Sequence, residues 1–273
     1  MNEHNHDDLD FLMAYQDSCD IPALQLIHGF PLSGSMWGPQ MEDLGNFARV
    51  IAPDLRGFGQ SEPVAGPYSM ALLADDCADL LGHLSVLTPF VIGGHSMGGY
   101  IAFEFYRNYK DHVGGLILTA TRPAPDSAEG KANRDKMIDL VRRRGVTAVS
   151  QPMLDVLFSP KTHESDPELV EFVRGLMEMA SPEGVIGALE AMRDRPDSRP
   201  TLAEIDVPVL IIHGADDQIV PVSEAEEMAA AISDCKLVIL ADAGHMPNLE
   251  QPDAFNDAVI DFLEELDLEN HGF

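Results

Sequence analysis

Positive charge is scarce in this chain: 17 lysines and arginines stand against 46 aspartates and glutamates, for a formal net charge of −29. Such a surface repels the phosphates of nucleic acid and anionic membrane lipids, so we expect neither as a partner. No apolar run approaches the roughly 18 residues that would span a bilayer. The first residues are polar and acidic, which does not fit a secretory signal, and we expect a cytoplasmic location.

Cysteine is equally sparse, since only Cys19, Cys77 and Cys235 occur, far apart. An odd number at such spacing argues against a disulfide framework and offers no metal-binding pattern. His4 and His6 lie in the polar N-terminal segment and are better explained as part of a solvated tail than as metal ligands. We therefore expect no metal ion, and the chemistry indicated below requires no organic cofactor.

The most informative motif is Gly94-His95-Ser96-Met97-Gly98. It follows the apolar run 89–93 and precedes the helix-like run 99–106, which makes a chance glycine-rich turn the weaker reading. A serine in a tight strand-to-helix turn projects its hydroxyl above the end of the sheet, and the glycines let strand and helix pass closely. The Met97 N–H then lies at the start of a helix, where partial positive charge suits an oxyanion.

A reactive serine needs a base, and the base needs an orienting group. Asp216 and Asp217 follow one predicted buried strand, and His245 follows the next, each in a glycine-containing loop. Because the carboxyl ends of parallel strands meet at one edge of a sheet, we expect Ser96, one of these aspartates and His245 to come together. The residues alone leave the choice between Asp216 and Asp217 open.

Predicted strands alternate with predicted helices, which is typical of a parallel sheet with helices on both faces. A hairpin edge is expected over Leu9–Asp17. The further strands expected are 22–27, 49–52, 89–93, 116–120, 207–213 and 236–240, and the core helices expected are 36–44, 69–84, 99–106 and 253–266. We predict an α/β fold with a mostly parallel central sheet.

The stretch 122–199 breaks this alternation because it carries no convincing strand. Amphipathic helices are predicted over 131–144, 166–180 and 181–194. We therefore expect two regions. Residues 1–121 and 200–273 form the α/β core, and residues 122–199 form an all-helical insertion between the sixth and seventh strands.

Together these motifs resemble the α/β-hydrolase superfamily over nearly the whole chain, in the branch of serine carboxylesterases, enol-lactonases and cofactor-free haloperoxidase-like enzymes. The segment 28–31 (His-Gly-Phe-Pro) resembles its oxyanion loop, 54–61 its D-x-R-G-x-G-x-S turn, and 214–217 its acid loop. The H-G-G-G oxyanion loop of some lipases and esterases is lacking. The resemblance implies that Asp217 is the acid and that residues 122–199 form a cap, or lid.

The resemblance also implies an activity, hydrolysis of a small carboxylic ester or lactone through an acyl-enzyme. Ser96 would be the nucleophile, His245 the base and Asp217 its orienting acid, with the backbone N–H groups of Phe30 and Met97 as oxyanion hole. Alternatives on the same residues are C–C bond hydrolysis of a β-diketone-like compound, perhydrolysis of the haloperoxidase type, and a non-catalytic small-molecule binder. Dehalogenases and epoxide hydrolases of this fold use an aspartate nucleophile, so Ser96 speaks against both.

Further side chains are candidates for the substrate pocket, although packing explains each of them as well. They are His28, Trp37, His95, Met153, Leu154, Leu157, Phe158, Leu176, Met177, Met179 and Met246. Asp54 and Arg56 are expected to stabilise their turn rather than bind substrate, and His213 is expected to be a packed core residue. The sequence leaves the oligomeric state and the acyl and alcohol preferences open.

The charge imbalance predicts a stability that depends on salt. Repulsion among acidic side chains opposes the compact state at low ionic strength, and added ions screen it. We expect the melting temperature to rise from dilute buffer to roughly 1 M salt, where the screening length is about 3 Å. This would fit adaptation to a salty environment, whereas an unchanged melting temperature would indicate an ordinary acidic protein.

Overall fold

The chain folds around one seven-stranded sheet, which we describe from a computed structural model covering residues 11–18, 23–86 and 89–266. The strands are β1 (Tyr15–Asp17), β2 (Ala23–Ile27), β3 (Arg49–Pro53), β4 (Phe90–His95), β5 (Val113–Thr119), β6 (Val209–Gly214) and β7 (Cys235–Leu240). Their order across the sheet is β1-β3-β2-β4-β5-β6-β7. β1 runs antiparallel to β3, and all other neighbours pair in parallel.

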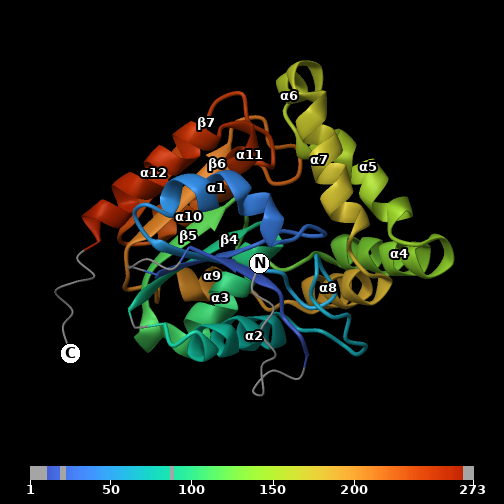
Figure 1. Ribbon diagram of the computed structural model, residues 1–273, viewed down its shortest axis with the longest axis horizontal. Helices are drawn as coiled ribbons and strands as arrows, with labels where there is room; N and C mark the ends of the chain where they lie inside the picture. Colours follow the sequence, from blue (N-terminus) through green and yellow to red (C-terminus); the bar gives the residue numbers. More distant parts are fainter. Residues whose placement is uncertain (1–10, 19–22, 87–88, 267–273) are drawn as a thin grey trace.

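Helices cover both faces of this sheet (Figure 1). Those of the α/β core are α1 (Gly38–Leu44), α2 (Met70–His83), α3 (Met97–Tyr109), α9 (Arg199–Leu202), α10 (Val222–Ala231), α11 (Pro247–Glu250) and α12 (Pro252–Glu265), with short 3₁₀ turns over Gly34–Trp37 and Lys110–His112. Strands β2, β4 and β6 are buried at every position, as their continuous apolar runs require. The predicted mostly parallel sheet between helical layers is confirmed.

Between β5 and α9, the short helix that precedes β6, the chain forms five helices and no strand. They are α4 (Ala128–Arg144), α5 (Thr147–Leu157), α6 (Pro160–Ser165), α7 (Pro167–Glu178) and α8 (Pro182–Asp194). Figure 1 shows them gathered on one side of the molecule. The flanking strands are the fifth and sixth of the described part, rather than the sixth and seventh. The count differs because the expected hairpin contributes only β1 there, and residues 9 and 10 lie outside the described ranges.

Side-chain caps explain where several helices begin. Ser69 accepts a hydrogen bond from the Leu72 N–H at 3.0 Å, and Ser181 accepts one from the Gly184 N–H at 2.9 Å. Sequence periodicity missed five helices, α5, α6, α9, α10 and α11. α5 contains Pro152, which disfavours a helix locally, and α6, α9 and α11 are too short to show a period.

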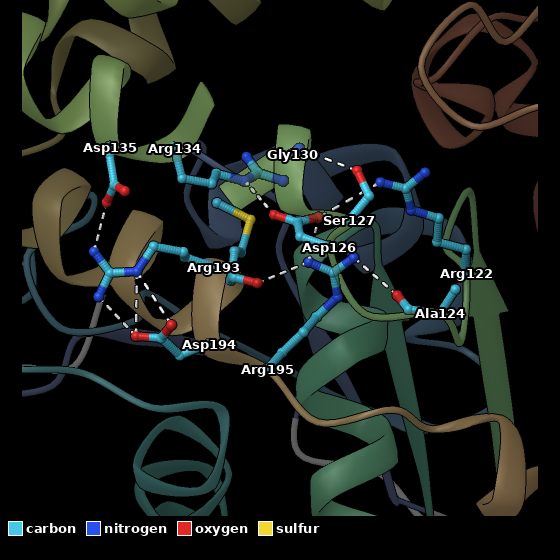
Figure 2. Close-up of polar contacts among 11 residues, drawn as sticks. Arg122, Ala124, Asp126, Ser127, Gly130, Arg134, Asp135, Arg193, Asp194 and Arg195 are labelled. Carbon is cyan, nitrogen blue, oxygen red and sulfur yellow. Dashed lines mark hydrogen bonds and ion pairs between the residues drawn. The ribbon is translucent and has the colours of Figure 1, made fainter. Parts of the chain in front are cut away.

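A buried carboxylate joins the two ends of this helical insertion (Figure 2). Asp126 lies just before α4, with its side chain 2% exposed, and its Oδ1 is 2.7 Å from Nη1 of Arg195, just after α8. Arg134 on α4 donates to the other carboxylate oxygen at 3.0 Å. Arg195 also donates to the backbone carbonyls of Met192 and Ala124, at 2.7 and 2.9 Å. The cluster therefore fixes where the insertion leaves and rejoins the core.

Removing this carboxylate charge should destabilise the protein. Burial alone would raise the pKa of Asp126, but Arg134 and Arg195 outweigh it and the pKa is lowered. The group thus stabilises the fold above the pKa it has in the unfolded chain, and loses this effect as the pH falls through its lowered value. We expect Asp126→Asn to cost about 3–5 kcal/mol at neutral pH, because it leaves the buried Arg195 guanidinium without its counter-charge.

Urea unfolding of wild type and variant, from neutral pH downward, measures this cost, and the difference should shrink in acid. Asp135→Asn is the matched control, because Asp135 is 59% exposed and pairs with Arg193 on the surface (Figure 2). An exposed pair contributes about 1 kcal/mol or less. Equal losses in the two variants would refute the role assigned to Asp126.

Candidate active site

Ser96 stands in a strained turn between β4 and α3. Its φ of +52° lies in the left-handed region, which a non-glycine residue adopts at a cost. A Cβ on Gly94 would come within 2.2 Å of the Gly98 carbonyl oxygen, and one on Gly98 would come equally close to that of Ile27. Gly94 is therefore required where β4 passes α3, and Gly98 where α3 passes the end of β2. The Thr121 hydroxyl donates to the Ser96 carbonyl at 2.8 Å and holds the turn.

Three side chains from separate loops form one hydrogen-bonded chain. Ser96 Oγ lies 2.9 Å from Nε2 of His245, and Nδ1 of His245 lies 2.7 Å from Oδ2 of Asp217. His245 is 3% exposed and the Asp217 side chain is fully buried, while Ser96 is half-buried. The structure thus brings together residues that follow the carboxyl ends of three strands, β4, β6 and β7.

Asp217, rather than Asp216, contacts the imidazole. Its second oxygen accepts hydrogen bonds from the N–H groups of Ile219 and Val220, at 2.8 and 2.9 Å. Burial alone would raise the pKa of Asp217, but His245 and these N–H donors outweigh it, so the pKa is lowered and the group stays a carboxylate. Asp216 is exposed, and its side chain has no hydrogen bond or ion pair within the described structure.

The two segments that carry the expected oxyanion N–H groups, those of Met97 and Phe30, approach each other at the serine turn. Met97 is the first residue of α3. The segment that follows β2 passes close to this helix start, since a Cβ on Gly98 would lie 3.0 Å from the His28 carbonyl oxygen. Phe30 follows two residues later. Among the described residues neither Phe30 N–H nor Met97 N–H has a backbone acceptor. Free N–H groups at a helix start can stabilise negative charge on an oxygen.

Three other histidines near the site are held neutral by burial. His28 donates from Nδ1 to the Gly29 carbonyl at 2.9 Å and accepts the Leu55 N–H at Nε2 at 3.0 Å, and burial lowers its pKa to about 4. Burial likewise lowers the pKa of His95 to about 3 and lowers that of His213. His28 therefore shapes the loop before Phe30, using both ring nitrogens.

His95 contacts both the backbone and the ring of His245. Its Nε2 donates to the His245 carbonyl at 2.6 Å, and its ring packs against those of His245 and Trp37, with centroids 5.0 and 6.5 Å apart.

Asp54 and Arg56 stabilise the fold around their turn, as predicted. Asp54 accepts the N–H groups of Gly34 and Gln60 at 2.7 and 2.8 Å, and Arg56 donates to buried Asp76 at 2.7 Å.

Most apolar pocket candidates lie in one buried layer that joins the insertion to the core. Its members include Trp37, Leu154, Leu157, Phe158, Leu176, Met177 and Met246, with half-buried Met153 packed against them. The Leu157 carbonyl accepts the N–H of His245 at 2.8 Å, so the end of α5 touches the histidine loop directly. Met179, another candidate, lies just beyond the end of α7, outside this layer, and is 52% exposed.

Sequence reasoning missed Glu250, whose carboxylate contacts the backbone on both sides of His245. Its signal was weak, since one acidic residue among 46 carries little information.

No cluster of three or more potential metal ligands occurs among the described residues. In the same ranges, no helix combines the length and apolar character needed to cross a bilayer.

Known proteins with this architecture match nearly the whole chain. Residues 26–258 match the Alpha/beta hydrolase family. The 3-oxoadipate enol-lactonase 2 of Acinetobacter baylyi is 32% identical over 88% of each chain. A thermophilic esterase from Thermogutta terrifontis, solved with malate bound, superposes with a TM-score of 0.92 at 41% identity, covering 94% of each chain. The enol-lactonase of Burkholderia xenovorans gives 0.86 at 29% identity, covering 93% of this chain and 97% of its own. The chain therefore belongs to the alpha/beta hydrolase family, in the branch of esterases and enol-lactonases.

Proposed function

We propose that this protein is a serine hydrolase that cleaves small carboxylic esters or lactones through an acyl-enzyme intermediate. The observation that carries the proposal is the hydrogen-bonded chain from Ser96 through His245 to Asp217. Relatives named as an esterase and as enol-lactonases support the ester or lactone bond as the target. Neither the C–C bond alternative nor perhydrolysis has a specific feature of the described site in its favour.

In the first half of the reaction, Ser96 Oγ attacks the carbonyl carbon while Nε2 of His245 takes its proton. Asp217 holds the Nδ1–H and stabilises the imidazolium, because its lowered pKa keeps it ionised while His245 gains charge. The negative oxygen of the tetrahedral intermediate accepts hydrogen bonds from the N–H groups of Phe30 and Met97. His245 then protonates the leaving alkoxide, which departs and leaves the acyl group on Ser96.

In the second half, water replaces the alcohol. His245 deprotonates a water molecule, which attacks the acyl carbonyl, and the proton returns to Ser96 Oγ as the acid leaves. For a lactone the leaving alkoxide stays tethered to the acyl group, and a single hydroxy acid is released. The buried neutral state of His28 and His95 leaves His245 as the ring that takes up this proton.

We further propose that residues 122–199 act as a cap over a core of residues 1–121 and 200–273. The bond from the His245 N–H to the Leu157 carbonyl supports this, since it attaches the insertion to the loop that carries the base. Leu157 and Phe158 share one buried apolar cluster with Trp37 and Met246 of the core. We infer that this cluster borders the acyl-binding site, which would favour an apolar acyl group over a charged one.

Replacing the nucleophile should abolish ester cleavage without unfolding the protein. On p-nitrophenyl esters of increasing acyl length, we expect Ser96→Ala to lower kcat by roughly 10⁶-fold, to the assay background. The melting temperature should stay that of wild type. Turnover by this variant, in a preparation shown to be free of host esterase, would refute the assignment.

The two adjacent aspartates provide a charge-matched test of the orienting acid. We expect Asp217→Asn to lower kcat by about 10⁴-fold, because the imidazole loses its anionic partner and its correct tautomer. Asp216→Asn makes the same charge change at an exposed position and should keep kcat within about twofold. Steady-state kinetics on one ester compares them, and similar losses in both variants would contradict the role of Asp217.

A further inference from the structure

The loop that carries His245 (residues 241–246, between β7 and α11) is held by other parts of the chain. The N–H of His245 bonds to Leu157 at the end of α5, and its carbonyl bonds to His95. These two contacts fix the residue's own peptide groups. They leave open what holds the residues directly before and after it, on which the position of the imidazole ring also depends.

The carboxylate of Glu250, the last residue of α11, holds both neighbours. Its Oε1 accepts the N–H of Gly244 at 2.7 Å and that of Met246 at 3.2 Å. Its Oε2 faces the insertion and accepts the Ser159 N–H and the Thr162 hydroxyl, both at 2.7 Å. One half-buried side chain therefore receives four hydrogen bonds and joins the histidine loop to the α5–α6 junction.

The backbone of the two segments also touches without intervening side chains. A Cβ on Gly244 would lie 2.6 Å from backbone atoms of both Phe158 and Ser159. The Ser159 hydroxyl donates to the Asp242 carbonyl at 3.2 Å. A movement of the α5–α6 junction must therefore move the histidine loop as well.

Only a carboxylate suits this position, because all four contacting groups arrive as donors. A carboxylate offers acceptors alone, and its hydrogen bonds are strengthened by its charge. A glutamine of the same shape would turn its NH₂ group toward one pair. The Thr162 hydroxyl can reverse its role, but the N–H groups of Ser159, Gly244 and Met246 cannot, so at least one would lose its acceptor.

We propose that Glu250 is a positioning residue that sets the placement of the His245 imidazole over Ser96 and ties it to the helical insertion. The inference rests on the proposed function. Asp217 orients the ring through Nδ1, whereas Glu250 fixes the loop that brings the ring to Ser96. Proton transfer is sensitive to this placement, since a displacement of about 1 Å can cost about 10²-fold in rate.

The test compares Glu250→Gln with Glu264→Gln, an identical change on α12 at an exposed position with no hydrogen bond or ion pair in the described structure. A serine-directed phosphonate first counts the reactive sites, so that kcat on a p-nitrophenyl ester is expressed per competent site. We expect Glu250→Gln to lower kcat by about 10–100-fold, with KM changed less than about threefold. Glu264→Gln should match wild type.

Two further readouts separate positioning from mere stabilisation. Glu250→Asp keeps the charge with a shorter reach, and its kcat should fall between wild type and Glu250→Gln. The acid limb of the kcat/KM profile, which reports the base, should shift in Glu250→Gln and not in Glu264→Gln. If Glu250→Gln does not fold, Glu250→Asp is judged against wild type by the same criteria.

A wild-type kcat per reactive site with an unchanged pH profile would overturn the proposal, even if the melting temperature fell. The failure of the proposed function has a different signature. In that case wild type itself would not react with the phosphonate at Ser96, whereas a failure confined to Glu250 leaves wild type reactive.

Discussion

The contact between His245 and Ser96 joins side chains 149 positions apart, and it depends on backbone segments that approach more closely than side chains allow. Gly94 lets β4 pass close to α3, Gly98 lets α3 pass close to the end of β2, and Gly244 lets the histidine loop lie directly on the α5–α6 junction. Each close approach places a backbone group where a Cβ would collide. The 2.9 Å contact is thus a consequence of how the sheet and the insertion pack.

The electrostatics around this contact are simple despite the net charge of −29. Burial lowers the pKa of His28 to about 4 and that of His95 to about 3, so both rings act as neutral hydrogen-bonding supports. Asp217 stays ionised because His245 and two N–H donors outweigh its desolvation. Nε2 of His213 also lies 3.4 Å from the Asp217 carboxylate, but burial lowers the pKa of His213. We infer that Asp217, rather than the acidic surface, balances a proton gained by His245.

Local patterns could predict the sheet, the serine turn and the order of the candidate residues, because apolar strand runs and glycine spacing depend only on residues that are close together in the sequence. The sequence left Asp216 and Asp217 open until the resemblance to a family separated them, since only folding shows which carboxylate faces His245. Glu250 was missed because its role depends on hydrogen bonds to residues 159 and 162, which are far from it in the sequence. α5 was missed because Pro152 argues against a helix while tertiary packing tolerates it.

The most direct test of the central claim is a crystal structure of the protein after reaction with a serine-directed phosphonate, which mimics the tetrahedral intermediate. The account predicts phosphorus bonded to Ser96 Oγ, a phosphonyl oxygen within hydrogen-bond distance of the N–H groups of Phe30 and Met97, and His245 still bonded to Asp217. A phosphonate attached elsewhere, or an oxygen pointing away from both N–H groups, would contradict it.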